Sequence, residues 1–161
     1  MINRARSNLE HFVARFRKDH EESSVVFVMM RFANVELLNA IFNHIKDTLK
    51  KEGVSVVRAD DKDYTNTIWE NIQVYMKGAD AGIAVFDYVS VGGEVPKCIN
   101  PNVSAEAGYM MGLEKPVLIL KDKNLPRLPT DFISHLYHAY DGDNPKSVKR
   151  PVKTWIRKLL S

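Results

Sequence analysis

The hydrophobic positions of the chain fall into short continuous runs separated by longer stretches with helical spacing. The runs are rich in β-branched and other apolar residues and lack polar alternation, which is typical of strands buried on both faces of a parallel sheet. Strands are therefore expected at 24–30, 54–57, 81–86, 116–120 and 136–140. Between these runs, apolar residues recur every three or four positions, which predicts amphipathic helices.

The expected helices follow from this spacing and from the residues that begin or stop a helix. Asn34 is expected to cap the second helix and Gly53 to stop it, while Gly78 ends the third. The helices are expected at 7–20, 35–52, 68–77, 102–113 and 148–160. Strands and helices therefore alternate after the first helix, in the order βαβαβαβ.

This alternation predicts an α/β fold in which right-handed crossovers place helices on both faces of a mainly parallel sheet. About five strands suit the flavodoxin-like, doubly wound order 2-1-3-4-5. We expect one such domain over residues 23–161. The amphipathic helix within residues 1–22 is an addition that packs on the core or on a partner.

Length and composition agree with one ordinary globular domain. The chain has 161 residues, of which 45% are hydrophobic and 27% charged, and about 150 residues is a usual domain size. No apolar run approaches the roughly 20 residues that cross a bilayer, and the N-terminus has no secretory pattern. We therefore expect no membrane association and a cytoplasmic location. Cys98 is the only cysteine, which excludes an internal disulfide and a cysteine-based zinc site.

Basic residues gather near the C-terminal end, although the formal net charge is only +3. No aromatic interleaving or helix-turn-helix pattern accompanies them, so a solvated helix face is favoured and nucleic acid is not expected as a partner. The residues concerned are Lys146, Lys149, Arg150, Lys153, Arg157 and Lys158.

The functional site is expected where the chain reverses direction between strands one and three, because a crevice opens there at the carboxyl ends of the strands. The segments 29–34, 58–64 and 87–101 reach this edge, as does the helix that begins at Asn102. The third segment is long for a strand-to-helix connection, and long loops are often functional. Its Gly92-Gly93 pair lacks the spacing of known phosphate loops and is better explained as a hinge.

Residues 100–109 (NPNVSAEAGY) are the most informative stretch for chemistry. If Asn102 caps the helix, Glu106 lies one turn inside it, close to the positive end of the helix dipole, and stays ionised. Such a carboxylate can attack or stabilise a cation, but it can also do no more than complement the dipole. Gly108 would allow close approach of a strand or ligand.

Three segments together resemble the superfamily of nucleoside 2-deoxyribosyltransferases and TIR-like proteins. They are VFVMMRF, ADAGIAVFD and NPNVSAEAGYMMGLEKPVLIL, and the resemblance spans residues 25–141. Members cleave N-glycosidic bonds of nucleosides, nucleotides or NAD, using a glutamate in the helix after the third strand. The resemblance implies that Glu106 is the catalytic residue, and it favours an enzyme that needs no cofactor or metal, with NAD a possible substrate.

Other residues at the same edge have suitable chemistry for such a substrate. Asp87 is placed to hold a ribose hydroxyl, while Arg31 and Phe32 are placed to meet a phosphate and the face of a base. The remaining candidate substrate-binding residues are Met30, Asp60, Asp61, Asn100 and Asn102. Trp69 and Trp155 have core spacing, so packing explains them better than ligand stacking.

Alternatives remain open. Deoxyribosyltransferases usually carry an aspartate five or six residues before the glutamate, where this chain has Asn100 and Pro101; this favours the TIR-like side of the resemblance. A phosphorelay receiver would place its acidic pair after strand one, not strand two, and the segment MRFAN lacks an FMN-binding loop. A non-catalytic nucleotide-binding or self-assembling signalling module is the main alternative, and we expect copies of the chain to associate.

Overall fold

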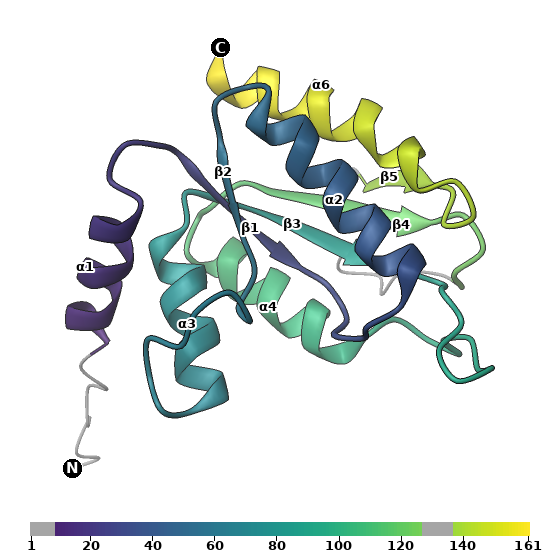
Figure 1. The fold of residues 1–161 in the computed structure, drawn as a ribbon, viewed down its shortest axis with the longest axis horizontal. Helices are drawn as coiled ribbons and strands as arrows, with labels where there is room; N and C mark the ends of the chain where they lie inside the picture. Colours follow the sequence, from purple (N-terminus) through teal and green to yellow (C-terminus); the bar gives the residue numbers. More distant parts are fainter. Residues whose placement is uncertain (1–8, 127–136) are drawn as a thin grey trace.

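The computed structural model describes residues 9–126 and 137–161. They form a five-stranded sheet in the order β2-β1-β3-β4-β5, in which every neighbouring pair is parallel (Figure 1). The flavodoxin-like α/β fold with strand order 2-1-3-4-5 is thus confirmed. The strands are β1 (Val25–Met29), β2 (Ser55–Val57), β3 (Ala81–Phe86), β4 (Val117–Asp122) and β5 (Tyr137–Tyr140).

Helices cover both faces of the sheet (Figure 1). α2 and α6 lie side by side on one face, and α3 and α4 lie on the other, with α1 beside α3. The described helices are α1 (Glu10–Asp19), α2 (Glu36–Lys50), α3 (Ile68–Gly78), α4 (Pro101–Gly112) and α6 (Lys149–Leu160), with a 3₁₀ turn, η1 (Pro145–Val148), before α6. None of these helices is long and apolar enough to cross a membrane.

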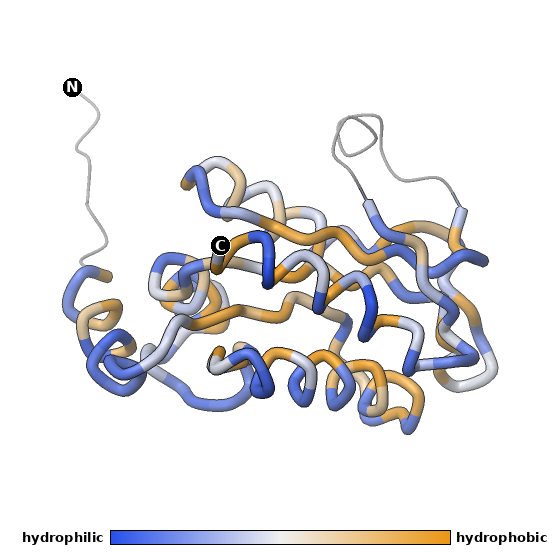
Figure 2. The backbone as a smooth tube through the Cα atoms, turned by 90° about the horizontal axis from the view of Figure 1, so that it is seen from above, coloured by the Kyte–Doolittle hydropathy of each residue, from blue (hydrophilic) through white to orange (hydrophobic). Residues whose placement is uncertain are grey.

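The alternation of side chains along β1 explains why its sequence is continuously apolar. Phe27 and Met29 belong to the core under α3 and α4, whereas Val26 and Val28 belong to the core under α2 and α6. All of β1 is buried. In Figure 2 the central strands are accordingly hydrophobic along their length, while the helices alternate between hydrophilic and hydrophobic positions.

α1 is anchored to the sheet domain through Phe16, which is fully buried. Its ring packs where Gly78 ends α3: a Cβ at Gly78 would lie 2.2 Å from Phe16 Cδ1, so only glycine fits there. Arg17 forms a 2.9 Å ion pair with Asp80, and Asp19 accepts a hydrogen bond from Tyr64 Oη at 2.8 Å. The helix is shorter than expected from the spacing, and positions 7 and 8 lie outside the described residues.

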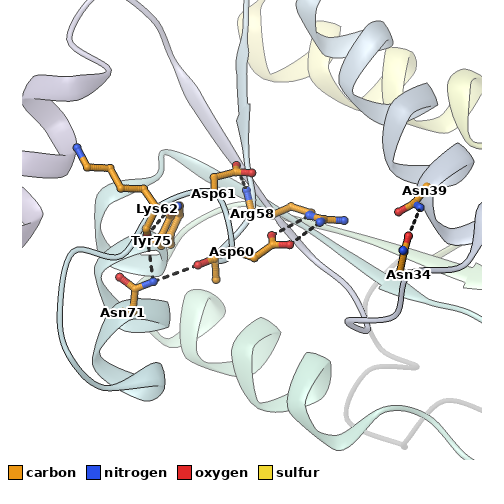
Figure 3. A network of polar contacts seen from close by, with 9 residues as sticks. Asn34, Asn39, Arg58, Asp60, Asp61, Lys62, Asn71 and Tyr75 are labelled. Carbon is orange, nitrogen blue, oxygen red and sulfur yellow. Dashed lines mark hydrogen bonds and ion pairs between the residues drawn. The ribbon is translucent and has the colours of Figure 1, made fainter.

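Two helix beginnings differ from the sequence predictions. Asn34 does not cap α2, because the N-cap position is Val35; Asn34 Oδ1 instead accepts a 3.1 Å hydrogen bond from Asn39 Nδ2 (Figure 3). The expected helix from 148 begins one residue later as α6, preceded by η1. Position 136 of the expected last strand lies outside the described residues.

Candidate functional site: a cavity at the carboxyl edge of the sheet

A cavity of about 330 Å³ lies at the carboxyl edge of the sheet, on the face covered by α3 and α4. Three segments far apart in the sequence form it: the residues after β1, the first turns of α3, and the first turns of α4. The lining residues are Met30, Arg31, Phe32, Ile68, Trp69, Ile72, Asn100, Asn102, Val103, Ala105 and Glu106. Six of the candidate site residues, Met30, Arg31, Phe32, Asn100, Asn102 and Glu106, are therefore brought together.

The α3 wall of the cavity is fixed by a polar network under the preceding loop (Figure 3). Asn71 accepts a hydrogen bond from the Tyr64 amide and donates to the carbonyl oxygens of Ala59 and Lys62. Tyr75 Oη donates to the Lys62 carbonyl and accepts from its amide. These bonds hold the loop after β2 in one conformation, so that the start of α3 faces the cavity.

The α4 wall depends on the N-cap of this helix, which lies two residues before the predicted one. Asn100, not Asn102, is the N-cap: its side-chain oxygen accepts hydrogen bonds from the amides of Asn102 at 2.9 Å and Val103 at 3.3 Å. Pro101 occupies the first helical position, where a missing amide hydrogen costs nothing. Glu106 consequently lies beyond the first turn, outside the strongest part of the helix dipole.

Glu106 is the most unusual group of the site. Only 7% of the residue is exposed, and no other described residue hydrogen-bonds to its carboxyl group. Burial alone raises the pKa of Glu106 to about 7. The expectation that this carboxylate stays ionised is therefore wrong: near neutral pH the carboxyl group is close to half protonated, because the charged form is desolvated without compensation.

Two aromatic side chains stand exposed at the mouth of the cavity. Phe32 is 58% exposed and Trp69 48% exposed, although both line the cavity. The interpretation of Trp69 as a core residue is thus wrong. Thr67 caps α3: its side-chain oxygen accepts from the Glu70 amide and donates to the Glu70 carboxylate, so Trp69 falls in the first turn, at the crevice. The spacing Thr-x-x-Glu was the sequence signal that could have placed it there. Trp155 is half-buried and packs on the core under α2 and α6.

Asp87 and Arg31 form an ion pair with one another instead of both pointing freely into the crevice. Arg31 Nη2 donates to Asp87 Oδ1 at 2.5 Å and to the Val89 carbonyl at 2.6 Å. Asp87 also accepts from the Val89 amide at 3.0 Å. Asp87 does not line the Glu106 cavity but an adjacent one of about 290 Å³, under the loop that follows β3, and Arg31 lines both.

The two aspartates after β2 do not line the Glu106 cavity. Asp60 forms an exposed ion pair with Arg58 and lines a neighbouring cavity, which shares Phe32, Ile68 and Ile72 with the Glu106 cavity. Asp61 accepts a hydrogen bond from the Arg58 amide (Figure 3) and lines none of the cavities named above.

The glycines singled out in the sequence serve turns or face solvent. Gly92 and Gly93 have φ of 62° and 84° and form a tight turn closed by two backbone hydrogen bonds between Val91 and Glu94. Gly108 has no described atom within 4 Å of an added Cβ, so no described strand approaches it closely, and close approach of a ligand stays a prediction. Within residues 9–126 and 137–161, no cluster of His, Cys, Asp and Glu could hold a metal ion.

The comparisons with known proteins support the fold only. No protein-family model matches the chain, and no curated protein matches it. The chain is similar to a mutant of the flavo di-iron protein from Thermotoga maritima, with a TM-score of 0.53 and 14% identity over 86% of this chain and 36% of that one. It is also similar to a 2-deoxyribosyltransferase from Bacillus psychrosaccharolyticus, with a TM-score of 0.46 and 17% identity over 78% of this chain and 90% of that one.

The first of these similarities agrees with the strand order in making this a protein of the flavodoxin-like α/β class. The chain spans little more than a third of the flavo di-iron protein that it matches. At such low identity the likeness concerns the fold, and the function has to be argued from the site.

Proposed function

We propose that the protein binds a nucleoside, a nucleotide or NAD in the Glu106 cavity and cleaves or transfers its N-glycosidic bond. The observation that carries this proposal is the state of Glu106: a buried residue whose carboxyl group has no hydrogen-bond partner among the described residues and which forms part of a cavity wall. A buried acid without a partner costs stability, and such groups concentrate at functional sites.

The rest of the cavity suits a flat base attached to a sugar. Phe32 and Trp69 offer exposed aromatic faces at the mouth, on which a heterocycle can stack. Asn100 and Asn102 line the wall next to Glu106 and can exchange hydrogen bonds with hydroxyl groups or base edges. The sequence resemblance to proteins that cleave N-glycosidic bonds supports the same substrate class.

In the proposed reaction the bond from the anomeric carbon to the base nitrogen breaks, and the electron pair leaves with the base. The ionised Glu106 carboxylate stabilises the cation that develops on the sugar, or bonds to the anomeric carbon as a sugar ester. Water, or a second base, then attacks the anomeric carbon and loses a proton; where the sugar ester has formed, this attack breaks the bond to Glu106 and releases its carboxylate. A pKa of about 7 allows Glu106 to exchange that proton near neutral pH.

One observation favours binding without turnover as the second candidate. Glu106 is the only acidic residue among the described residues that line its cavity, whereas glycoside-cleaving sites usually combine two carboxyl groups. Asp87, which lines the adjacent cavity, is engaged by Arg31. A nucleotide-binding or self-assembling signalling module would keep the cavity and need no second acid.

The two functions separate in one experiment. The protein is incubated with NAD, deoxynucleosides and nucleoside monophosphates, and chromatography measures free base or nicotinamide; calorimetry measures binding of the same compounds. Glu106→Gln is compared with Glu114→Gln, which changes an exposed acid just after α4. Release that is lost only in Glu106→Gln supports the enzyme. Binding without release supports the module, and neither binding nor release overturns both.

A further inference from the structure

The opposite face of the sheet carries a second concave site, which the proposed function does not use. A groove of about 540 Å³ is lined by residues of α2 and α6, two helices that lie side by side on this face of the sheet (Figure 1). Five of the residues that line it are cationic and two are acidic. They are Lys51, Lys149, Arg150, Lys153 and Arg157 on the one hand, and Asp47 and Glu52 on the other.

Few of these cations are neutralised. Arg157 is paired with Glu52 at 2.9 Å, but no described residue forms an ion pair with the other four, and Asp47 is the only acid left in the groove. Lys149, Lys153 and Arg157 are spaced four residues apart on α6. They therefore form one stripe with a step of about 6 Å along the helix, and Lys51 joins them from the end of α2.

The positive field of this region also acts on a neighbouring histidine. The pKa of His44, on α2, is lowered from its ordinary value, first by burial and then by Lys149 and Lys146. Like charges that face each other across a groove cost folding free energy. If these residues only kept the helix face solvated, their charges could be spread over the surface. Their convergence in one groove therefore indicates a site for an anion.

We propose that the groove between α2 and α6 binds a compact anion with two or more phosphoryl groups, such as a free oligophosphate or the phosphate chain of a nucleotide. Four unpaired cations against one acid leave an excess of three positive charges, which a single phosphate group cannot neutralise. The groove is concave, which suits a small ligand better than a flat membrane surface. A nucleic-acid interface needs roughly 600 Å² or more of protein surface, whereas these cations converge in one groove.

The probe for the test is sodium tripolyphosphate, titrated into the full chain by calorimetry at low ionic strength. Phosphate, ATP and adenosine are the comparison ligands: if the groove variants weaken the binding of tripolyphosphate and ATP and leave any binding of adenosine unchanged, recognition is assigned to the phosphate chain. Lys149→Gln and Lys153→Gln are each expected to weaken tripolyphosphate binding about tenfold, because each removes one charge-assisted hydrogen-bond donor. Lys77→Gln, an exposed position on α3 across the sheet, is the matched control and should bind like the unchanged protein.

The variants have a second readout that does not depend on a ligand. Since the like charges repel each other, Lys149→Gln and Lys153→Gln should melt at or above the temperature of the unchanged protein when no ligand is present. The proposal is overturned if tripolyphosphate does not bind at low salt, or if the groove variants bind it as well as Lys77→Gln. It is also overturned if only an oligonucleotide or phosphatidylserine vesicles bind. Base release at the Glu106 cavity is measured separately, so the two proposals fail independently.

Discussion

Asp87 and Glu106 are two buried acids near the same edge of the sheet, but their hydrogen-bonding surroundings differ. This difference distinguishes a structural carboxylate from a functional one. Asp87 is 5% exposed and accepts hydrogen bonds from Arg31 and from the Val89 amide. Glu106 is 7% exposed and has no such donor among the described residues. Burial is therefore equal, and only the supply of donors differs.

The comparison teaches that burial alone does not mark a site. A carboxylate that is hydrogen-bonded and paired with an arginine is stable as a charge and contributes to the fold. A buried carboxyl group without hydrogen-bond donors has a raised pKa, as Glu106 does. The second arrangement gives the fold nothing that a neutral residue could not, which is why we place the chemistry at Glu106 and the structural role at Asp87.

The largest expected effect is the loss of base release in Glu106→Gln. If the Glu106 carboxylate stabilises the developing sugar cation, its neutral amide should lower kcat by a factor on the order of a thousand, corresponding to about 4 kcal/mol of transition-state free energy. Chromatographic rates measured with saturating substrate give kcat directly. Asp87→Asn tests the comparison, since a larger loss of kcat there, in folded protein, would exchange the roles of the two acids.

The second expected effect is a fall in stability with rising pH, which the difference between the unchanged protein and Glu106→Gln assigns to Glu106. Its pKa is about 7 in the folded protein and 4.5 ordinarily, so between these pH values the folded state holds a proton that the unfolded state has released. The free energy of unfolding contributed by this group is fully present below pH 4.5. It falls by on the order of 3 kcal/mol as the pH rises to about 7.

Urea unfolding at several pH values measures this contribution as the difference between the unchanged protein and Glu106→Gln. The free energy of unfolding of Glu106→Gln should rise relative to that of the unchanged protein between pH 4.5 and 7. Above pH 7 the difference between the two should stay constant. A difference that is flat with pH would mean that the Glu106 carboxyl group is solvated or paired, and the comparison with Asp87 would lose its basis.

The fold was predictable from the sequence because it depends on patterns that many residues share. β1 and β3 are continuous apolar runs, and the segments between the strands have helical spacing. This alternation of strands and helices favours the doubly wound parallel topology. The carboxyl edge followed from that topology, and it placed Met30, Arg31, Phe32 and Glu106 in one region before any coordinates.

The details of the site were less predictable because they depend on single contacts. Asn100 and Asn102 are both good cap residues, so the residue type alone does not choose between them. Asn100 is the cap because Pro101, which follows it, favours the first helical position. Trp69 is exposed because Thr67 starts α3 just before it. The raised pKa of Glu106 could not be predicted at all, because no local pattern reports that donors are missing.

The third expected effect is a loss of stability in Asp87→Asn. The change removes the ion pair with Arg31, whose side chain is 22% exposed, and we expect the free energy of unfolding to fall by about 2 kcal/mol, less than for a fully buried pair. Asp60→Asn breaks the exposed pair with Arg58 and should cost less than about 1 kcal/mol. Urea midpoints of the two variants compare them directly, and equal losses would show that the Asp87 pair is no more structural than a surface pair.

The last expected effect concerns Trp69, whose indole is half exposed at the mouth of the Glu106 cavity. If a base stacks on it, Trp69→Ala should weaken ligand binding by about 1–3 kcal/mol while changing the free energy of unfolding by less than about 1 kcal/mol. The Trp155→Phe variant leaves Trp69 as the only tryptophan, so its fluorescence reports this site alone. Quenching of that signal by a nucleotide that Glu106→Gln also binds would place the base beside the indole. An unchanged signal at saturation would move the base elsewhere in the cavity and leave the half-exposed indole to another role, such as contact with a second copy of the chain.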